Sequence, residues 1–490
     1  MSIEHIDVLI VGAGLSGIGA AAHLGKNCPE RSFAVLEGRE RLGGTWDLFR
    51  YPGIRSDSDM YTLGYAFKPW TEEKAIADGD TILSYIASTA RDHGIDEHIR
   101  YGHRVTRANW SQPDGHWLVD ISTGPHSAPQ QLSCNFLYIC TGYYNYDSGH
   151  TPAFEGSERF TGRIVHPQNW TTDVDYAGKR VVVIGSGATA VTLVPTLAAT
   201  AAHVTMLQRS PTYVVSRPSR DPIAASLGRH LPGGMAYSLT RWKNVLLGMF
   251  FFRLSKRRPE KVKKLIIDGV KKSVGPTCDV DKHFTPSYKP WDQRVCLVPD
   301  ADLFKAIRSG KASVVTEHID TFTETGVRLK SGQELQADVV VTATGLDLLA
   351  LGGMELLVDG RPVVMKDSIS YKGMMLSGVP NMIYVTGYTN ASWTLKADLV
   401  GDYACRLLNF MARKGWGQCT PTLNDPGIQP ESWIDFTSGY IQRAIDKFPA
   451  QGNRRPWRLS QNYVLDLFTL RYGRVDDGTM VFTQPTKVRP

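Results

Sequence analysis

Short apolar runs that end at glycine or at a polar residue recur along the chain and predict the strands of parallel sheets. The first two runs, at 8–11 and within SFAVLE at 32–37, flank an alanine-rich segment with helical spacing. The same order returns at 181–184 and 203–208, again around a segment with helical spacing. Strands that alternate with helices in this way are typical of a doubly wound α/β fold.

Two further apolar runs divide the chain into domains. NFLYICTG, at 135–142, and ADVVVTATG, at 337–345, both end in Thr-Gly and resemble each other. We interpret them as the two places where the chain crosses between domains. The sequence therefore predicts an α/β protein with one discontinuous domain, at 1–145 and 345–490. A second domain, at 150–340, is inserted in it and carries a helical insertion at about 220–290.

The first glycine-rich turn, GAGLSG at 12–17, follows the first run. Gly12, Gly14 and Gly17 have the G-x-G-x-x-G spacing that lets a chain turn tightly, approach a pyrophosphate and pack a helix on a strand. Glu37 ends the second run, twenty residues after Gly17. Because a carboxylate at that place accepts hydrogen bonds from ribose hydroxyl groups, the turn predicts a site for an unphosphorylated ribose, as in FAD.

The second glycine-rich turn, GSGATA at 185–190, repeats this spacing with alanine in the last position; its members are Gly185, Gly187 and Ala190. The strand after it ends in Arg209 where the first unit has an acid, and Ser210 adds a hydroxyl group. A carboxylate would repel a 2′-phosphate, whereas a guanidinium pairs with it through two hydrogen bonds. The turn therefore favours NADPH; the alternative for Arg209 is a surface arginine at a strand end.

Two dinucleotide sites in one chain indicate hydride transfer from NADPH to a flavin, with the protein holding both cofactors in position. Gly43 and Gly44 suit close approach of the backbone to the flavin nucleotide, and Trp46 is able to stack on a flat ring. Flavin disulfide reductases carry a cysteine pair soon after a comparable Gly-Gly. No cysteine lies between Cys28 and Cys134, so the sequence excludes that class.

The formal net charge of +7 is concentrated in one segment, because residues 253–272 hold nine Lys or Arg and two acids. An apolar run at 245–252 precedes it and is too short to span a bilayer, which needs about 20 residues. The alternatives are a packed helix followed by a solvated cationic helix, or a peripheral membrane contact through 241–272. No aromatic platform accompanies the charges, so nucleic acid binding is not expected.

Cysteine usage and the start of the chain bear on localisation. The seven cysteines are odd in number, widely scattered and without a C-x-x-C, which argues against a disulfide framework and a metal site. The first strand begins within a few residues of Met1, which leaves no length for a signal peptide. These features predict a cytoplasmic protein, with the peripheral membrane contact as an addition.

The segment FTGRIVHPQNW, at 160–170, lies between the first crossing and the second turn. Its pattern F-x-G-x-x-x-H-x-x-x-W, formed by Phe160, Gly162, His166 and Trp170, resembles the fingerprint of the type I Baeyer–Villiger monooxygenases, in the flavin-containing monooxygenase superfamily. The resemblance runs from residue 1 to about residue 470. A second family pattern matches Gly43, Gly44, Trp46, Tyr51, Pro52, Gly53 and Asp57.

One residue of the fingerprint narrows the family assignment, and one departure from it limits what it implies. Related enzymes that oxidise nitrogen and sulfur usually carry Tyr in place of Trp170, which places this chain on the Baeyer–Villiger side. The family pattern often continues with Pro or Asp, whereas Thr171 and Thr172 precede Asp173 here. We therefore interpret His166 as a hinge histidine that couples domain rotation to cofactor handling, without a role in proton transfer.

The resemblance also implies a catalytic pair. WDQRVCLVPDADLF, at 291–304, aligns with the stretch that carries the family's active-site arginine, which is Arg294 here. Asp57 matches the acid beside that arginine, although the residue alone would be interpreted as a solvated loop carboxylate. Gln293 stands where the family often has a lysine that helps bind the 2′-phosphate, so this additional contact is left open.

Family chemistry gives the pair its role. Reduced flavin and O₂ form a C4a-peroxyflavin, which attacks a ketone as an anion and oxidises sulfur or nitrogen when it is protonated. A fixed guanidinium favours the anion and stabilises the oxyanion of the adduct. By position, the resemblance implies further contacts to FAD, NADPH or both from Ser16, Thr45, Trp46, Asp47, Leu48, Arg55, Ser56, Val105, Ser186, Ala188, Thr189, Val191 and Asn390.

Three functions stay open from the sequence. The first is oxygenation of a small apolar ketone to an ester or lactone with NADPH and O₂, with sulfoxidation as a side activity. The second is a flavin monooxygenase that acts chiefly on sulfur or nitrogen, such as that of a thioether. The third, from a different class, is a flavin-holding redox sensor without turnover.

Overall fold

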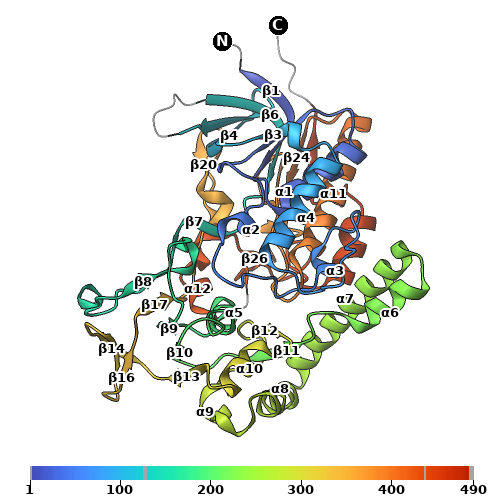
Figure 1. Cartoon of the computed structure of the whole chain (residues 1–490). Coiled ribbons are helices and arrows are strands. Elements are labelled where there is room, and N and C mark those ends of the chain that lie inside the picture. Colours follow the sequence, from blue (N-terminus) through green and yellow to red (C-terminus); the bar gives the residue numbers. More distant parts are fainter. Residues whose placement is uncertain (1–2, 125–129, 435–436, 485–490) are drawn as a thin grey trace.

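The computed structural model describes residues 3–124, 130–434 and 437–484. The chain forms two α/β units on separate sheets, and a pair of long helices projects beside them (Figure 1). We call the part on the larger sheet the first unit and the part on the smaller sheet the second unit. The predicted fold class, with two Rossmann-like units, is confirmed.

The sheet of the first unit collects strands from both sides of the second unit in the sequence. Its order is β20-β19-β4-β5-β6-β1-β2-β3, with β23 also beside β6. Within the described residues its strands are β1 (Glu4–Val11), β2 (Phe33–Leu36), β3 (Ile99–Arg100), β4 (Arg104–Ser111), β5 (His116–Ser122), β6 (Gln130–Ile139), β19 (Glu355–Val358), β20 (Arg361–Pro362) and β23 (Met382–Tyr384).

Both faces of the central strand β1 are covered. Val8 and Ile10 pack on one face with α1 (Leu15–Asn27) and α11 (Trp393–Lys414). Leu9 packs on the other face with Trp110 and Trp117 of the β4–β5 hairpin. Burial on both faces explains why this strand is a continuous apolar run without alternation.

The second unit has a fully parallel sheet in the order β13-β10-β9-β17-β8. Edge strand β8 belongs to the fingerprint segment and was not predicted. The strands and the two helices packed on them are β8 (Arg163–Val165), β9 (Arg180–Ile184), β10 (His203–Gln208), β13 (Ala312–Thr316), β17 (Val339–Thr342), α5 (Ala188–Leu197) and α10 (Asp302–Arg308).

Both chain crossings between the units lie side by side. β7 (Tyr144–Gly149) follows β6, β18 (Leu346–Leu348) follows β17, and the two strands pair in antiparallel orientation. Backbone hydrogen bonds from His150 N to Gly345 O, at 3.1 Å, and from Leu349 N to Tyr143 O, at 2.9 Å, extend the pairing. We call this two-stranded connection the ribbon.

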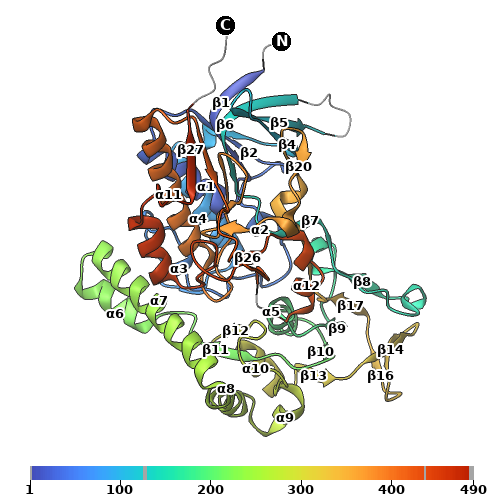
Figure 2. The same cartoon turned by 180° about the vertical axis from the view of Figure 1, so that it is seen from behind.

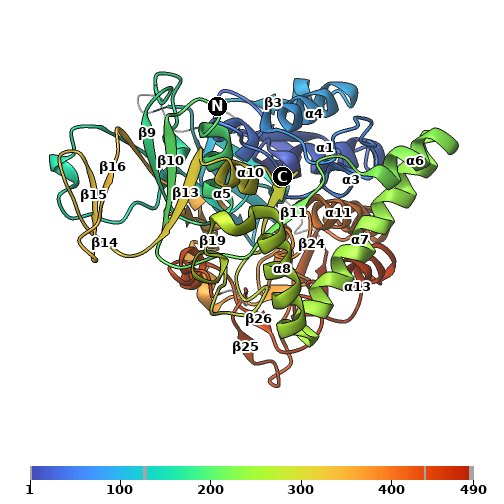
Figure 3. The same ribbon diagram turned by 60° about the horizontal axis from the view of Figure 1, so that its bottom comes forward.

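The helical insertion comprises α6 (Pro222–His230), α7 (Gly233–Arg257), α8 (Pro259–Val274) and α9 (Val280–His283). No helix in the described part of the chain combines the length and apolarity that crossing a bilayer requires. Figure 2 and Figure 3 show α6 and α7 alongside the first unit and α8 near α10, at the side of the second unit.

The helix α7 is fastened to the first unit, although the sequence predicts the insertion as part of the second. Arg241 Nη1 donates to the carbonyl oxygens of Tyr61 and Gly64, both at 2.8 Å, beside α3 (Met60–Leu63). Its Nη2 lies 3.5 Å from Asp398 Oδ2 on α11. By contrast, α8 buries Val270 in the core of the second unit. The insertion is therefore shared between the two units.

Candidate functional site

A cavity of about 1170 Å³ lies between the two units, and both glycine-rich turns, the ribbon and the segment 438–443 contribute to its wall. Typical small-molecule pockets have about 300–1,000 Å³. The cavity is therefore large enough for two long cofactors that meet between the units.

The first turn is closed and buried. Gly12 has a φ of 103° and donates from its N–H to Leu36 O at 2.7 Å. A Cβ on Gly17 would lie 1.8 Å from Gly12 O, so α1 packs directly against the turn. Gly44 lies against Gly14, since a Cβ added to Gly14 would be 3.5 Å from Gly44 Cα. These contacts leave the backbone itself as the surface that faces the cavity.

Glu37 stands at the end of β2 as predicted, with its carboxylate at the cavity wall. It accepts hydrogen bonds from Ala13 N at 2.8 Å and from Arg39 N at 3.0 Å. Burial raises the pKa of Glu37, while these backbone donors favour the carboxylate. Each carboxylate oxygen can accept a further hydrogen bond, which fits the hydroxyl groups of a ribose.

The second turn has the same backbone course with a more open surface. Gly185 has a φ of 139° and donates from its N–H to Leu207 O at 2.8 Å. Gly187 is exposed and has open space where a Cβ would stand. Arg209 is exposed at the cavity rim. Gln208 points elsewhere, because its amide donates to His283 O at 2.7 Å.

The structure brings Arg294 and Asp57 together at the cavity wall. Arg294 Nη2 lies 2.8 Å from Asp57 Oδ2, and the arginine side chain is 38% exposed, toward the cavity that it lines. The Asp57 carboxylate raises the pKa of Arg294 above its ordinary value, against the opposing effect of burial. The guanidinium is therefore a permanent cation, and the pair joins the first unit to the segment before β12 (Cys296–Pro299).

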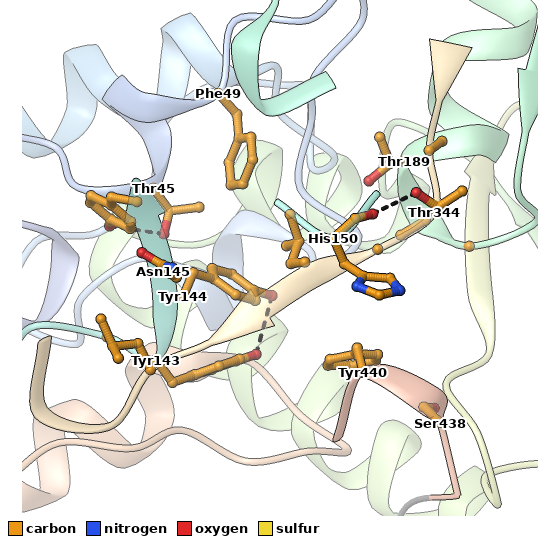
Figure 4. Close-up of a pocket in the computed structure, with 18 of the residues that line it drawn as sticks. Thr45, Phe49, Tyr143, Tyr144, Asn145, His150, Thr189, Thr344, Ser438 and Tyr440 are labelled. Atoms are coloured by element: carbon orange, nitrogen blue, oxygen red, sulfur yellow. Dashed lines mark hydrogen bonds between the residues drawn. The ribbon is translucent and has the colours of Figure 1, made fainter. Parts of the chain in front are cut away.

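Three tyrosines surround this pair, and sequence reasoning missed all of them. The hydroxyl groups of Tyr143 and Tyr144, on the ribbon, lie 3.3 Å apart, and Tyr440 comes from α12 (Gly439–Gln442) (Figure 4). Burial raises the pKa of Tyr144 to about 12 and also raises that of Tyr143 and Tyr440. All three remain protonated donors. The run YYNY after the first Thr-Gly was the available signal.

Arg55 bridges the units near the ion pair of Arg294 and Asp57. Its Nη1 lies 2.5 Å from Asp302 Oδ2, at the start of α10. Its Nη2 is buried and makes no hydrogen bond within the described structure. A buried donor that lines a cavity without a partner fits an anionic group of a bound cofactor.

The fingerprint segment packs against the ribbon through His166 and does not line the cavity. His166 Nε2 donates to Gly345 O at 3.2 Å, and its Nδ1 accepts from Gln168 N at 3.2 Å, which fixes the neutral tautomer. A Cβ on Gly149 would collide with the imidazole, so the ring packs on both ribbon strands. Burial lowers the pKa of His166. These contacts agree with a hinge position.

Most predicted site residues line the cavity, and several do not. Those on the wall are Gly12, Gly14, Ser16, Glu37, Thr45, Trp46, Arg55, Ser56, Asp57, Val105, Gly185, Ser186, Gly187, Ala188, Thr189, Arg209, Ser210 and Arg294. The others stand behind it: Gly17, Asp47, Leu48, Ala190, Val191 and Asn390.

Asp47 and Asn390 show why position alone misplaces a side chain. The Asp47 carboxylate is buried between two arginines, at 2.6 Å from Arg39 Nη2 and 2.5 Å from Arg50 Nη2. Asn390 donates from Nδ2 to Gln461 O at 3.0 Å. Both side chains therefore support loops at the cavity and do not face it.

Comparison with known proteins identifies the family. The description "Flavin-binding monooxygenase-like" matches residues 75–352, and "NAD(P)-binding Rossmann-like domain" matches residues 10–69. The chain is 54% identical to the FAD-containing monooxygenase EthA of Mycobacterium tuberculosis, over 98% of each chain. It is 50% identical to EthA of Mycolicibacterium smegmatis, again over 98% of each.

Solved structures share the fold. An oxidised steroid monooxygenase bound to NADP superposes with a TM-score of 0.74 at 22% identity, covering 98% of this chain and 100% of that one. A cyclohexanone-bound cyclohexanone monooxygenase in a rotated conformation gives a TM-score of 0.72 at 20% identity, covering 86% and 90%. The predicted resemblance is confirmed: the chain belongs to the flavin-binding monooxygenase-like family.

Proposed function

We propose that the chain is an NADPH- and FAD-dependent Baeyer–Villiger monooxygenase. The reaction consumes a ketone, O₂, NADPH and a proton, and yields an ester or lactone, NADP⁺ and water. The observation that carries the proposal is the ion pair of Arg294 and Asp57, at 2.8 Å, on the wall of a cavity that also reaches both glycine-rich turns. The relatives named as FAD-containing monooxygenases support the same class.

The residues at the cavity fit both cofactors. The first turn and Glu37 would hold the adenosine half of FAD, and the second turn with Arg209 would hold the 2′-phosphate of NADPH. Arg55, with its unpartnered buried Nη2, would donate a hydrogen bond to a phosphate or carbonyl oxygen between the two. Bound FAD, once reduced by NADPH, supplies the chemistry that activates O₂.

Arg294 provides the specificity for ketones. Its guanidinium is a fixed cation in a site walled by Tyr143, Tyr144 and Tyr440, where a charge acts more strongly than in water. It stabilises negative charge on the attacking oxygen and on the oxyanion that forms from the carbonyl. Asp57 holds the guanidinium plane, and the protonated tyrosines narrow access of water to it.

The test is product identification with a panel of linear, cyclic and aryl ketones and thioethers in the presence of NADPH and O₂. We expect Arg294→Ala to retain FAD and lose ester formation by about 100-fold or more, as for removal of one oxyanion donor. Arg294→Lys should also fail largely, because a point charge lacks the planar fork. The matched control is Arg474→Ala, which breaks a surface ion pair with Asp476 at 3.1 Å, outside the cavity.

Oxidation of thioethers is the second activity that the site supports. Sulfur attacks a protonated, electrophilic oxygen donor, which does not need the cation at Arg294. Raising the pH should therefore favour esters over sulfoxides, because it deprotonates the oxygen donor while Arg294 stays charged. Full ester formation by Arg294→Ala would remove this residue from the mechanism.

We also propose that the enzyme contacts an anionic lipid surface through α7. Large apolar side chains recur every three or four residues on the outer face of this helix, and Phe250 is 58% exposed. They are Met235, Leu239, Trp242, Leu246, Leu247 and Phe250. Exposed cations follow at Arg253, Lys256, Arg257 and Arg258. An apolar stripe beside clustered cations is the pattern of helices that lie on a bilayer.

Vesicle flotation tests this contact. The protein should float with vesicles of phosphatidylglycerol and phosphatidylcholine at low salt, and detach at high salt. The double variant Leu246→Asp, Phe250→Asp should not float, whereas Val364→Asp, which changes an exposed apolar residue just after β20 in the first unit, should float as the wild type does. Equal flotation of all three would refute the assignment to α7.

A further inference from the structure

Trp291, three residues before Arg294, has a backbone conformation that large side chains rarely adopt. Its φ is 68°, in the left-handed region where the Cβ of a bulky residue meets its own backbone. A bridge between Pro290 and Gln293 closes the chain around it. A strained turn persists only where surrounding contacts hold it, and such turns concentrate at functional sites.

The end of α7 holds this turn from one side. The ring of Phe252 packs edge-on against the ring of Trp291, with centroids 5.6 Å apart and planes at 77°. Lys256 Nζ donates to Trp291 O at 3.2 Å and lies 3.1 Å from Asp292 Oδ1. Two contacts from successive turns of one helix fix both the side chain and the carbonyl group of Trp291.

The segment before α12 holds the turn from the opposite side. Thr437 donates to Asp292 O from its backbone N at 3.0 Å and from Oγ1 at 3.2 Å. The Trp291 ring also packs with the apolar cluster that contains Leu348 and Trp433. The same segment continues to Tyr440, one of the tyrosines beside Arg294. The turn is therefore clamped between α7 and the wall of the cavity.

We infer that Trp291 is a positioning residue that aims Arg294 into the cavity and so sets the ratio of ester to sulfoxide. The inference rests on the proposed function. Asp57 restrains only the tip of the arginine, whereas the turn fixes where its backbone starts. Oxyanion stabilisation needs a donor placed to within a fraction of an ångström, while oxygen transfer to sulfur does not use the cation. Loosening the turn should therefore lower ester formation more than sulfoxidation.

The test compares products from a ketone and a thioether in substitutions at Trp291. Trp291→Gly accepts the positive φ but removes the ring, so the ester-to-sulfoxide ratio should fall by about tenfold or more, with FAD content unchanged. Trp291→Phe keeps an aromatic contact with Phe252 and should restore most of the ratio. The control is Trp416→Ala, which deletes a half-buried ring packed on Phe482, far from the cavity wall.

A second variant keeps the inference testable if Trp291→Gly does not fold. Phe252→Ala removes the partner ring from α7, which does not line the cavity, and should shift the ratio in the same direction by a smaller factor. An unchanged ratio in both variants, or an equal loss of ester and sulfoxide, would overturn the positioning role. A wild-type protein that forms sulfoxide but no ester would instead overturn the proposed function.

Discussion

The two glycine-rich turns share a backbone course and differ in how much protein covers them. In each, the first glycine has a positive φ and donates to the end of the neighbouring strand, from Gly12 at 2.7 Å and from Gly185 at 2.8 Å. The first turn continues into buried residues, and Gly44 packs against it. The second turn leaves Gly187 exposed with free space around it.

This difference separates a cofactor that stays from one that exchanges. A site enclosed by packed backbone has to open before its ligand leaves, whereas an open turn releases its ligand without disturbing the core. In the proposed function FAD is retained through many cycles and NADP⁺ leaves in each one. The same glycine pattern thus serves both a retained and an exchanged cofactor. The protein packed over each turn determines which of the two it holds.

The largest effect is expected from Gly17→Ala, which gives the first turn the alanine that the second turn has in its last position, Ala190. The added Cβ would lie 1.8 Å from Gly12 O, so backbone atoms have to move. We expect a loss of about 3 kcal/mol or more in the free energy of unfolding, and loss of FAD. Thermal unfolding and flavin content per chain measure both.

The matching change in the open turn is Gly187→Ala. Because a Cβ there meets no atom within 4 Å, the melting temperature should not fall, and only the KM for NADPH should rise. If both substitutions destabilise the protein equally, the contrast between a closed and an open turn is wrong.

An intermediate effect is expected from Arg209→Gln, which sharpens the contrast in charge between the two strand ends. An arginine–phosphate pair is worth about 1.5–3 kcal/mol, and exposure of Arg209 reduces that, so the KM for NADPH should rise about tenfold. The KM for NADH should not change, since it has no 2′-phosphate. Steady-state kinetics with NADPH and NADH measure both KM values. An equal rise in the two KM values would show that Arg209 does not bind the 2′-phosphate.

The smallest effect is expected at His166, which packs on the ribbon between the two units. Burial lowers the pKa of His166, so the folded protein favours the neutral imidazole. The contribution of His166 to the free energy of unfolding is therefore complete above the unfolded pKa of about 6.5. It is lost as the pH falls below that value and through the folded pKa. Protonation of Nδ1 breaks the hydrogen bond from Gln168 N, a loss of about 1 kcal/mol.

The measurement is the melting temperature as a function of pH, with His166→Asn as the comparison. The wild type should lose stability below about pH 6.5 more steeply than the variant, which does not titrate there. If the melting temperatures of the two proteins fall in parallel below about pH 6.5, protonation of His166 is not the cause of the acid destabilisation.

Local pattern was enough for the two glycine-rich turns and the strands on either side of them, and it failed where distant contacts decide. Glu37 was predictable because its place is fixed by one turn, one helix and one strand. Arg294 and Asp57 were paired only through the family resemblance, since nothing in their spacing brings them together. Strand β8 was missed because three residues carry too little periodicity. The anchoring of α7 by Arg241 was also missed, because a helical pattern shows which face is covered but not by what.

The division of the insertion has a practical consequence. Because Arg241 ties α7 to one unit while Val270 ties α8 to the other, any rotation of one unit against the other would alter the angle at the junction of Arg258 and Pro259. The distance between the two helices therefore reports how the two units are arranged relative to each other. A donor and an acceptor dye, one on each helix, would follow the working cycle of a single molecule without entering the place where the reaction occurs.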